Sequence, residues 1–270
     1  MSFRVKRYDI KSNKVTSAEP ISLIFLSDLH LTEHGASNCD LIDAIDGLHP
    51  DLILVGGDMI VGKEGKSTAV AEELLSRLAI KYTVIYALGN HEQRMKDKTE
   101  RFGDIYELYQ RRLCSCGIHL LDNMMEEIEM KGTSIRIYGL CLPLMYYKRF
   151  TRHELPIQEM QERLGSLDEK KINILLAHHP RFTKTYFEWG ADLTLSGHIH
   201  GGVMRLGKQP VISPDFQLFP KYGYGQFVQD NKQLLISGGL GEHTIPFRIF
   251  NPKELLYIEI SQEVSHGDSR

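Results

Sequence analysis

Three apolar runs, each ending in small or polar residues, constrain the fold of this chain more than any other feature. The runs read ISLIFLSD (21–28), DLILVGGD (51–58) and YTVIYALGN (82–90). Their near-continuous Ile, Leu and Val content is typical of strands that are buried on both faces. Helical spacing of apolar residues is found at 38–48, 68–79 and 100–117. Asn38 is the expected N-terminal cap of the first helix. This alternation predicts βαβ units.

The second half of the chain is richer in strands than in helices. Strands are expected at 133–142, 171–179, 191–198, 232–239 and 253–260, and a helix at 156–164. No repeat, low-complexity tract or Pro/Gly linker marks a domain boundary. We therefore expect one α/β domain over residues 1–270, with two sheets rather than one because the strands are numerous.

The composition limits the classes of binding partner and the cellular compartment that we expect for this chain. The chain has 32 Lys and Arg against 35 Asp and Glu, a net charge of −3, so no nucleic-acid partner and at most peripheral membrane contact are expected. The four cysteines lack the spacing of a disulfide framework or a zinc pair, which favours reduced thiols. No signal peptide and no apolar run of about 18 residues is found. We expect a cytoplasmic protein, and its oligomeric state stays open.

Oxygen and imidazole side chains follow five of the expected strands. They are Asp28, His30, Asp58, Asn90, His91, His178, His198 and His200. Ligands of α/β sheets bind beyond the carboxyl ends of the strands, so these five ends can converge. Each motif alone is better explained as a turn or a cap, but the full set predicts a site for Mn²⁺, Fe or Zn²⁺. If His198 and His200 extend a strand, both imidazoles lie on one side of it.

The ordered motifs DxH (28–30), GD (57–58), GNHE (89–92), His178 and GHxH (197–200) resemble the calcineurin-like metallophosphoesterase superfamily. The carboxyl-terminal segments resemble its branch of bacterial phosphodiesterases typified by YaeI and YkuE. Val203 departs from that branch, which often has Gln after GHxHGG. The resemblance implies a four-layer α/β/β/α sandwich of two mixed β-sheets flanked by helices, with two divalent metal ions per chain.

The same resemblance implies a role for each motif residue. One ion would be bound by Asp28, His30 and His200, the other by Asn90, His178 and His198, and Asp58 would bridge both. Mn²⁺ is the expected metal, with Fe or Zn²⁺ as alternatives. His91 would be the catalytic residue, which protonates the leaving oxygen or stabilises charge on the phosphoryl group. The roles of His179 and His243 stay open.

The implied activity is hydrolysis of a phosphodiester or pyrophosphate bond by a metal-bridging hydroxide. The substrate would be a small or lipid-linked phosphoester. The segment LCLPLMYYKRF (140–150) could contact a lipid tail, although a buried connection between sheets is the favoured interpretation. Two alternatives are a phosphomonoesterase, including a protein phosphatase, and a non-catalytic metal-binding scaffold. The scaffold predicts eroded ligands, whereas all seven are present.

Overall fold

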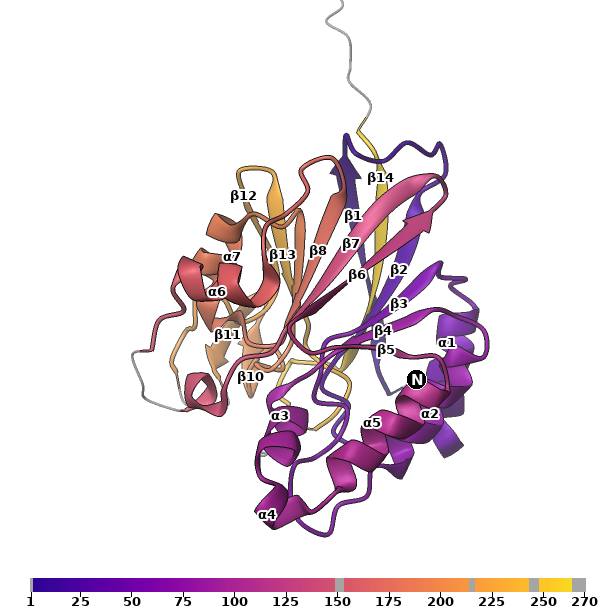
Figure 1. Cartoon of the computed structure of the whole chain (residues 1–270), viewed down its shortest axis with the longest axis vertical. Coiled ribbons are helices and arrows are strands. Elements are labelled where there is room, and N and C mark those ends of the chain that lie inside the picture. The colour runs from indigo at the N-terminus through magenta and orange to yellow at the C-terminus, as the bar shows by residue number, and fades with distance from the viewer. Residues whose placement is uncertain (1, 149–152, 214–216, 243–247, 264–270) are drawn as a thin grey trace, which may run out of the picture.

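The computed structural model describes residues 2–148, 153–213, 217–242 and 248–263, and two six-stranded sheets form its centre (Figure 1). Sheet A contains β1 (Arg4–Ser12), β2 (Ile21–Leu26), β3 (Leu52–Val55), β4 (Val84–Ala87), β5 (His119–Leu121) and β14 (Glu254–Gln262). Sheet B contains β6 (Met124–Met130), β7 (Thr133–Leu140), β8 (Ile172–Ala177), β9 (Leu193–Ser196), β12 (Gly225–Gln229) and β13 (Lys232–Ile236). A separate hairpin contains β10 (Met204–Leu206) and β11 (Gln209–Ile212).

Both sheets are mixed, and their central strands are parallel. The strand order is β1-β14-β2-β3-β4-β5 in sheet A and β12-β13-β9-β8-β7-β6 in sheet B. In sheet A only the β14–β2 pair is antiparallel, and in sheet B the edge strands β6 and β12 are. The carboxyl ends of β2, β3 and β4 therefore lie along one edge of sheet A, and those of β8 and β9 along one edge of sheet B.

Helices cover the outer face of each sheet, so the molecule has four layers (Figure 1). Sheet A packs against α1 (Cys39–Asp46), α2 (Ala69–Ala79) and α5 (Ile105–Ser115), and sheet B against α6 (Ile157–Leu164) and α7 (Thr183–Trp189). β2 is almost entirely apolar because the side chains on both of its faces are buried. Ile24 and Leu26 contact the helix layer, whereas Leu23 and Phe25 contact the opposite sheet. The expected sandwich of two mixed sheets is confirmed.

One local expectation about helices is wrong, and another is confirmed only in position. Residues 100–117 form two helices, α4 (Thr99–Phe102) and α5, because the chain breaks at Gly103 with φ 58°. Asn38 is the N-cap residue of α1, as expected, but its side chain makes no capping hydrogen bond; its Oδ1 accepts the His34 amide N–H at 3.0 Å instead. A helix that was not expected, α3 (Asn90–Asp97), begins directly after β4.

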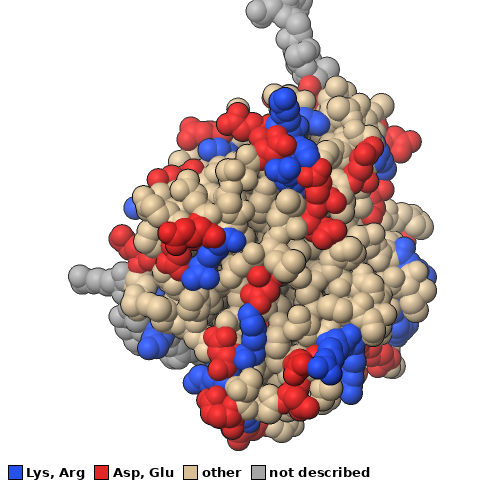
Figure 2. Space-filling model, in the orientation of Figure 1, with Lys and Arg blue, Asp and Glu red and all other residues tan. Residues whose placement is uncertain are grey.

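The mixed surface charge and the free cysteines agree with what the composition predicts. Lysine and arginine atoms are interspersed with aspartate and glutamate atoms on the face drawn in Figure 2. All four cysteines are free, as expected: Cys39, Cys114, Cys116 and Cys141. Among the described residues, none of the helices has the length and apolar character needed to cross a bilayer.

Candidate metal centre

Five loops bring the motif residues together where the two sheets meet. Asp28, Asp58 and Asn90 follow the neighbouring strands β2, β3 and β4, and backbone bonds tie the loops, as from the Asp28 amide to the Gly57 carbonyl at 3.0 Å. His178 follows β8. The backbone N–H of Gly197, which follows β9, donates to the His178 carbonyl at 3.0 Å. The strand ends converge because parallel strands present their carboxyl ends at one edge.

The local backbone differs from the strand extension considered for His198 and His200. β9 ends at Ser196, so both histidines lie in the turn that follows it, and their strand-like arrangement is wrong. Asp28, His30 and Asp58 share with them a left-handed backbone, with φ between 47° and 66° across the five residues. Non-glycine residues adopt this conformation at a cost, and such strain concentrates at functional sites.

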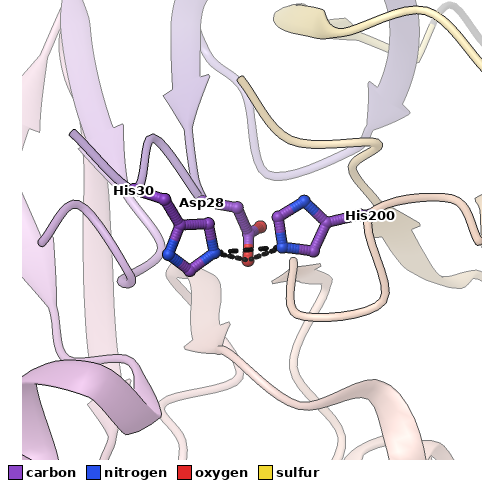
Figure 3. Close-up of side chains that lie close together, drawn as sticks. All are labelled: Asp28, His30 and His200. Carbon is purple, nitrogen blue, oxygen red and sulfur yellow. Dashed lines mark hydrogen bonds and ion pairs between the residues drawn. The ribbon is translucent and has the colours of Figure 1, made fainter. Parts of the chain in front are cut away.

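Asp28, His30 and His200 form the first set of candidate ligands, with one potential ligand atom from each within 4.8 Å of the others (Figure 3). The Nε2 atoms of the two histidines lie 3.1 Å apart. The Oδ1 atom of Asp28 lies 3.4 Å from the His200 Nε2 and 3.9 Å from the His30 Nε2. The carboxylate also accepts the backbone N–H of His198 at 3.0 Å, which fixes its orientation toward the histidines.

Asp58, His178 and His198 form the second set of candidate ligands, whose potential ligand atoms again lie within 4.8 Å of one another. The Nδ1 atom of His178 bonds to the Gly56 carbonyl at 2.7 Å, so its Nε2 points at the cluster and lies 3.0 Å from the Asp58 Oδ2. Asp58 is also grouped with His30 of the first set within 4.8 Å. Its carboxylate therefore lies between the two sets.

Charge in this buried cluster is balanced by protons on histidine. Burial would lower the pKa of His178, but the Asp58 carboxylate raises it to about 10. Burial would raise the pKa of Asp58, yet His178 holds this pKa well below its usual value. Burial raises the pKa of Asp28 and lowers the pKa of His30. His178 thus carries the positive charge that stabilises the Asp58 carboxylate.

His91 is fixed in one tautomer by the backbone. Its Nδ1 accepts the Gly62 N–H at 2.8 Å, so the neutral ring carries its proton on Nε2. That Nε2 lies 4.0 Å from the Asp58 Oδ2 and faces the cluster. Burial lowers the pKa of His91, and the Gly62 N–H would oppose a proton on Nδ1. His91 is therefore a neutral hydrogen-bond donor at the site.

Glu92 is a buried residue of the GNHE motif that was not singled out from the sequence. Its carboxylate accepts the backbone N–H groups of Asp58 and Met59 at 2.9 Å each, and that of Gly89 at 3.1 Å. The Tyr86 hydroxyl donates to it at 2.6 Å. Burial and the Asp58 charge raise the pKa of Glu92 to about 7, against the N–H groups that favour its ionised form. Glu92 joins the loops after β3 and β4.

The segment 140–150 is both a buried connection and a wall of the site. Cys141, Leu142 and Tyr146 are buried, as expected. Tyr147 instead stacks on His179, with ring centroids 5.4 Å apart, and its ring centroid lies 5.5 Å from that of His198. Residues 149 and 150 lie outside the described residues, as does His243.

His179 contacts the candidate ligand His198, and Arg248 contacts the candidate ligand His200. His179 is buried, with its ring centroid 4.2 Å from that of His198, so it is not a solvent-exposed residue. Arg248 donates to the Gly238 carbonyl at 2.7 Å and lies 3.0 Å from the Nδ1 of His200. Because arginine only donates, this contact leaves the His200 proton on Nε2, facing His30. No motif in the sequence points to Arg248, which lies in a loop far from His200 along the chain.

Comparisons with known proteins agree with this geometry. The calcineurin-like phosphoesterase family matches residues 21–202, more than half of the chain. The uncharacterized protein YpbG of Bacillus subtilis is 27% identical over 252 residues, covering 91% of this chain and 83% of YpbG. Phosphodiesterase YaeI of Escherichia coli is 27% identical over 211 residues, covering 74% of this chain and 67% of YaeI.

A solved structure shares the fold. NAD nucleotidase (NadN) of Haemophilus influenzae matches with a TM-score of 0.50 and 16% identity, over 84% of this chain and 46% of that chain. The motifs from Asp28 to His200 all lie within the residues that the family matches. The resemblance to the superfamily and to its YaeI-like branch is thereby confirmed. The chain belongs to the calcineurin-like phosphoesterase family, and its two residue sets are candidate ligands for the metal ions on which that family depends.

Proposed function

We propose that the protein is a dinuclear metal-dependent phosphoesterase that hydrolyses a phosphodiester or pyrophosphate bond. The observation that carries this proposal is the position of Asp58, whose carboxylate is grouped both with His30 of the first set and with His178 and His198 of the second. One carboxylate between two sets of ligands is what a pair of ions sharing a bridging ligand requires.

The donor set fits two transition-metal ions. The first would be bound by Asp28, His30 and His200, the second by Asn90, His178 and His198, with Asp58 as the bridge. The buried Oδ1 atom of Asn90 has no hydrogen-bond partner among the described residues. A buried polar atom left without a partner is costly, which supports a ligand role for Asn90.

Carboxylate, amide and imidazole donors together suit Mn²⁺, Fe or Zn²⁺, and Mn²⁺ is our proposal. When bound, such ions supply a nucleophilic hydroxide and Lewis-acid stabilisation of phosphoryl oxygens. Binding at the first set would also replace the proton that His200 now directs at His30, so the Arg248 contact with its Nδ1 would have to be given up.

His91 would act as the catalytic residue through its Nε2–H group. The neutral ring would donate this hydrogen bond to a phosphoryl oxygen as negative charge develops there. The Gly62 N–H on Nδ1 favours this role over proton transfer, because it holds the ring in its neutral form. It also argues against His91 as a metal ligand, although His91 is grouped with His30 and Asp58.

A diester substrate is favoured by the likeness to YaeI, whose name is that of a phosphodiesterase. We propose a small or lipid-linked phosphoester as substrate. We further propose a single domain over residues 1–270, because β1 and β14, far apart in sequence, pair over nine residues in sheet A. The cytoplasmic location is proposed from the four free thiols.

The test is hydrolysis by the Mn²⁺-reconstituted protein of bis(p-nitrophenyl) phosphate and of p-nitrophenyl phosphate, in parallel. We expect the diester to be hydrolysed with the higher kcat/KM, and Asp58→Ala to abolish both activities. A higher kcat/KM for the monoester would identify a phosphomonoesterase instead. Metal binding without hydrolysis of these esters, of nucleotide-sugar pyrophosphates or of phospholipids would support the scaffold.

A further inference from the structure

An exposed apolar face lies on the hairpin that follows the metal-ligand loop. β10 begins four residues after His200, and three segments extend the hairpin into a small sheet. Met204 of β10 pairs with Ile212 of β11 and with Ile249, and Ile212 also pairs with Leu218. Residues directly opposite each other in neighbouring strands present their side chains on the same face. These four apolar side chains therefore form one row across the hairpin sheet.

The row points outward, with Met204 and Ile212 half-buried at its centre and Leu218 and Ile249 exposed, because the other face of the sheet contacts the rest of the protein. Arg205, next to Met204, is 5% exposed and its guanidinium lies over the Tyr224 ring at 3.5 Å from the centroid. Side chains alternate along a strand, so Met204 and Leu206 lie on the opposite side from Arg205. Leu206 is 57% exposed, which agrees with this direction.

Two phenylalanines enlarge the row at its outer segments. Phe219 follows Leu218, and Phe250 follows Ile249; the exposed fractions of the phenylalanines are 60% and 76%. Both have a left-handed backbone, with φ 48° and 53°. This conformation is unfavourable for a bulky side chain, and it breaks the alternation that would turn every second residue inward. The fold thus holds consecutive apolar residues in solvent at a cost in backbone energy.

We call these seven residues the apolar face: Met204, Leu206, Ile212, Leu218, Phe219, Ile249 and Phe250. Lys208 and Lys221 lie within two residues of its members along the chain, and both are exposed. The described residues 198–213, 217–229 and 248–253 contain no aspartate or glutamate, and Asp215 lies outside the described residues. Lys208 and Lys221 therefore give the apolar face a positively charged border, although the net charge of the whole chain is −3.

The apolar face is joined rigidly to the candidate metal centre. The Asn251 side chain, one residue after Phe250, donates to the carbonyls of His200 at 2.6 Å and of Gly202 at 2.5 Å. The Ile249 N–H donates to the Val203 carbonyl at 3.0 Å. A surface bound at the apolar face is therefore held at a fixed position beside the ligand loop.

We propose that the apolar face docks on a membrane surface that contains anionic lipid. Exposed Phe, Leu and Ile flanked by lysine are the composition of an interfacial binding surface, in which apolar side chains enter the lipid and lysines approach its charged headgroups. Protein–protein interfaces are depleted of lysine. In a symmetric pair of copies, Lys208 and Lys221 would pack against the same patch of the other copy, whose described part offers no acidic residue to pair with them. Docking needs neither metal nor catalysis, so it is tested apart from the hydrolysis proposed above.

The experiment is co-sedimentation of the full chain with phosphatidylcholine vesicles, with or without an equal part of phosphatidylglycerol. Wild-type protein should bind the anionic vesicles, and Phe219→Ser/Phe250→Ser should bind at least about tenfold more weakly, since both aromatic anchors are lost. Lys208→Gln/Lys221→Gln should lose the preference for anionic vesicles and the salt dependence that goes with it. Ile80→Ser is the matched control, because Ile80 is 82% exposed at the end of α2 and should not matter.

Three results would overturn the proposal. The first is wild-type protein that does not sediment with anionic vesicles. The second is unchanged binding of the double phenylalanine variant, or an equal loss in Ile80→Ser. The third is a wild-type dimer in sedimentation equilibrium that Phe219→Ser/Phe250→Ser dissociates, without any vesicle binding, which would make a second copy the occupant. Circular dichroism of each variant checks that the exposed substitutions leave the fold intact.

Discussion

Replacing His91 by alanine tests whether this residue stabilises charge on the phosphoryl group without binding metal. The Gly62 N–H holds the Nδ1 of His91 unprotonated at 2.8 Å, so the ring offers the site one N–H donor from Nε2 and no lone pair. Removing one preorganised donor to a developing oxyanion costs about 10²–10³ in kcat, or about 2.7–4 kcal/mol. We expect His91→Ala to lose kcat by this factor and to keep its full metal content.

The assay is steady-state hydrolysis of an aryl and an alkyl phosphodiester, with metal content measured on the same samples. A neutral donor gives no proton to the leaving oxygen, so the loss should be similar for both esters. His91→Gln, whose amide can donate in place of the ring, should recover part of the rate. Loss of metal from His91→Ala would refute the assignment, and a much larger loss with the alkyl ester would identify His91 as a general acid.

Three further predictions concern the ligands and their support. Asp58→Asn should abolish hydrolysis and lower the metal content below that of wild type, because one oxygen and the negative charge of the bridge are lost; full metal content with wild-type rate would contradict the bridge. Metal affinity should rise with pH, by about tenfold per unit below pH 10, because binding must displace the His178 proton whose pKa is about 10. Calorimetry in buffers of different ionisation enthalpy should detect that released proton, and pH-independent affinity would show that His178 binds no metal. Glu92→Gln should lower the free energy of unfolding by about 1–3 kcal/mol, measured with urea, because one carboxylate oxygen becomes an NH2 group that cannot accept from the Asp58, Met59 or Gly89 amide; unchanged stability would contradict this support.

The layers of the fold could be predicted from the sequence because parallel strands that are buried on both faces consist almost entirely of apolar residues. β2, β3, β4 and β8 are buried at every position, and each appears in the sequence as an apolar run interrupted at most once, by Ser22 in β2 and Asn173 in β8. The edge strand β1 was not expected. β1 pairs with a single neighbour, β14, and most of its residues are exposed or half-buried, so no apolar run marks it in the sequence. The break at Gly103 was missed because apolar spacing continues across it.

The ligand positions could be predicted, whereas the residues that orient them could not. Asp28 and His200 each follow a strand end, and the topology of the sheets brings those ends together. Arg248 and Asn251 contact His200 from 48 and 51 residues away, a relation that no local motif records. The spacing of His198 and His200 suggested a strand, but their left-handed backbone places them in a turn.

The most direct test of the proposed centre is the number of metal ions bound per chain. The chelator-treated protein is reconstituted with Mn²⁺, freed of excess metal and analysed by inductively coupled plasma mass spectrometry against protein concentration. Two ions per chain are expected in the wild type, with a lower number in Asp58→Ala. Wild-type protein that retains no metal, or that binds one ion regardless of Asp58, would contradict a dinuclear centre bridged by this carboxylate.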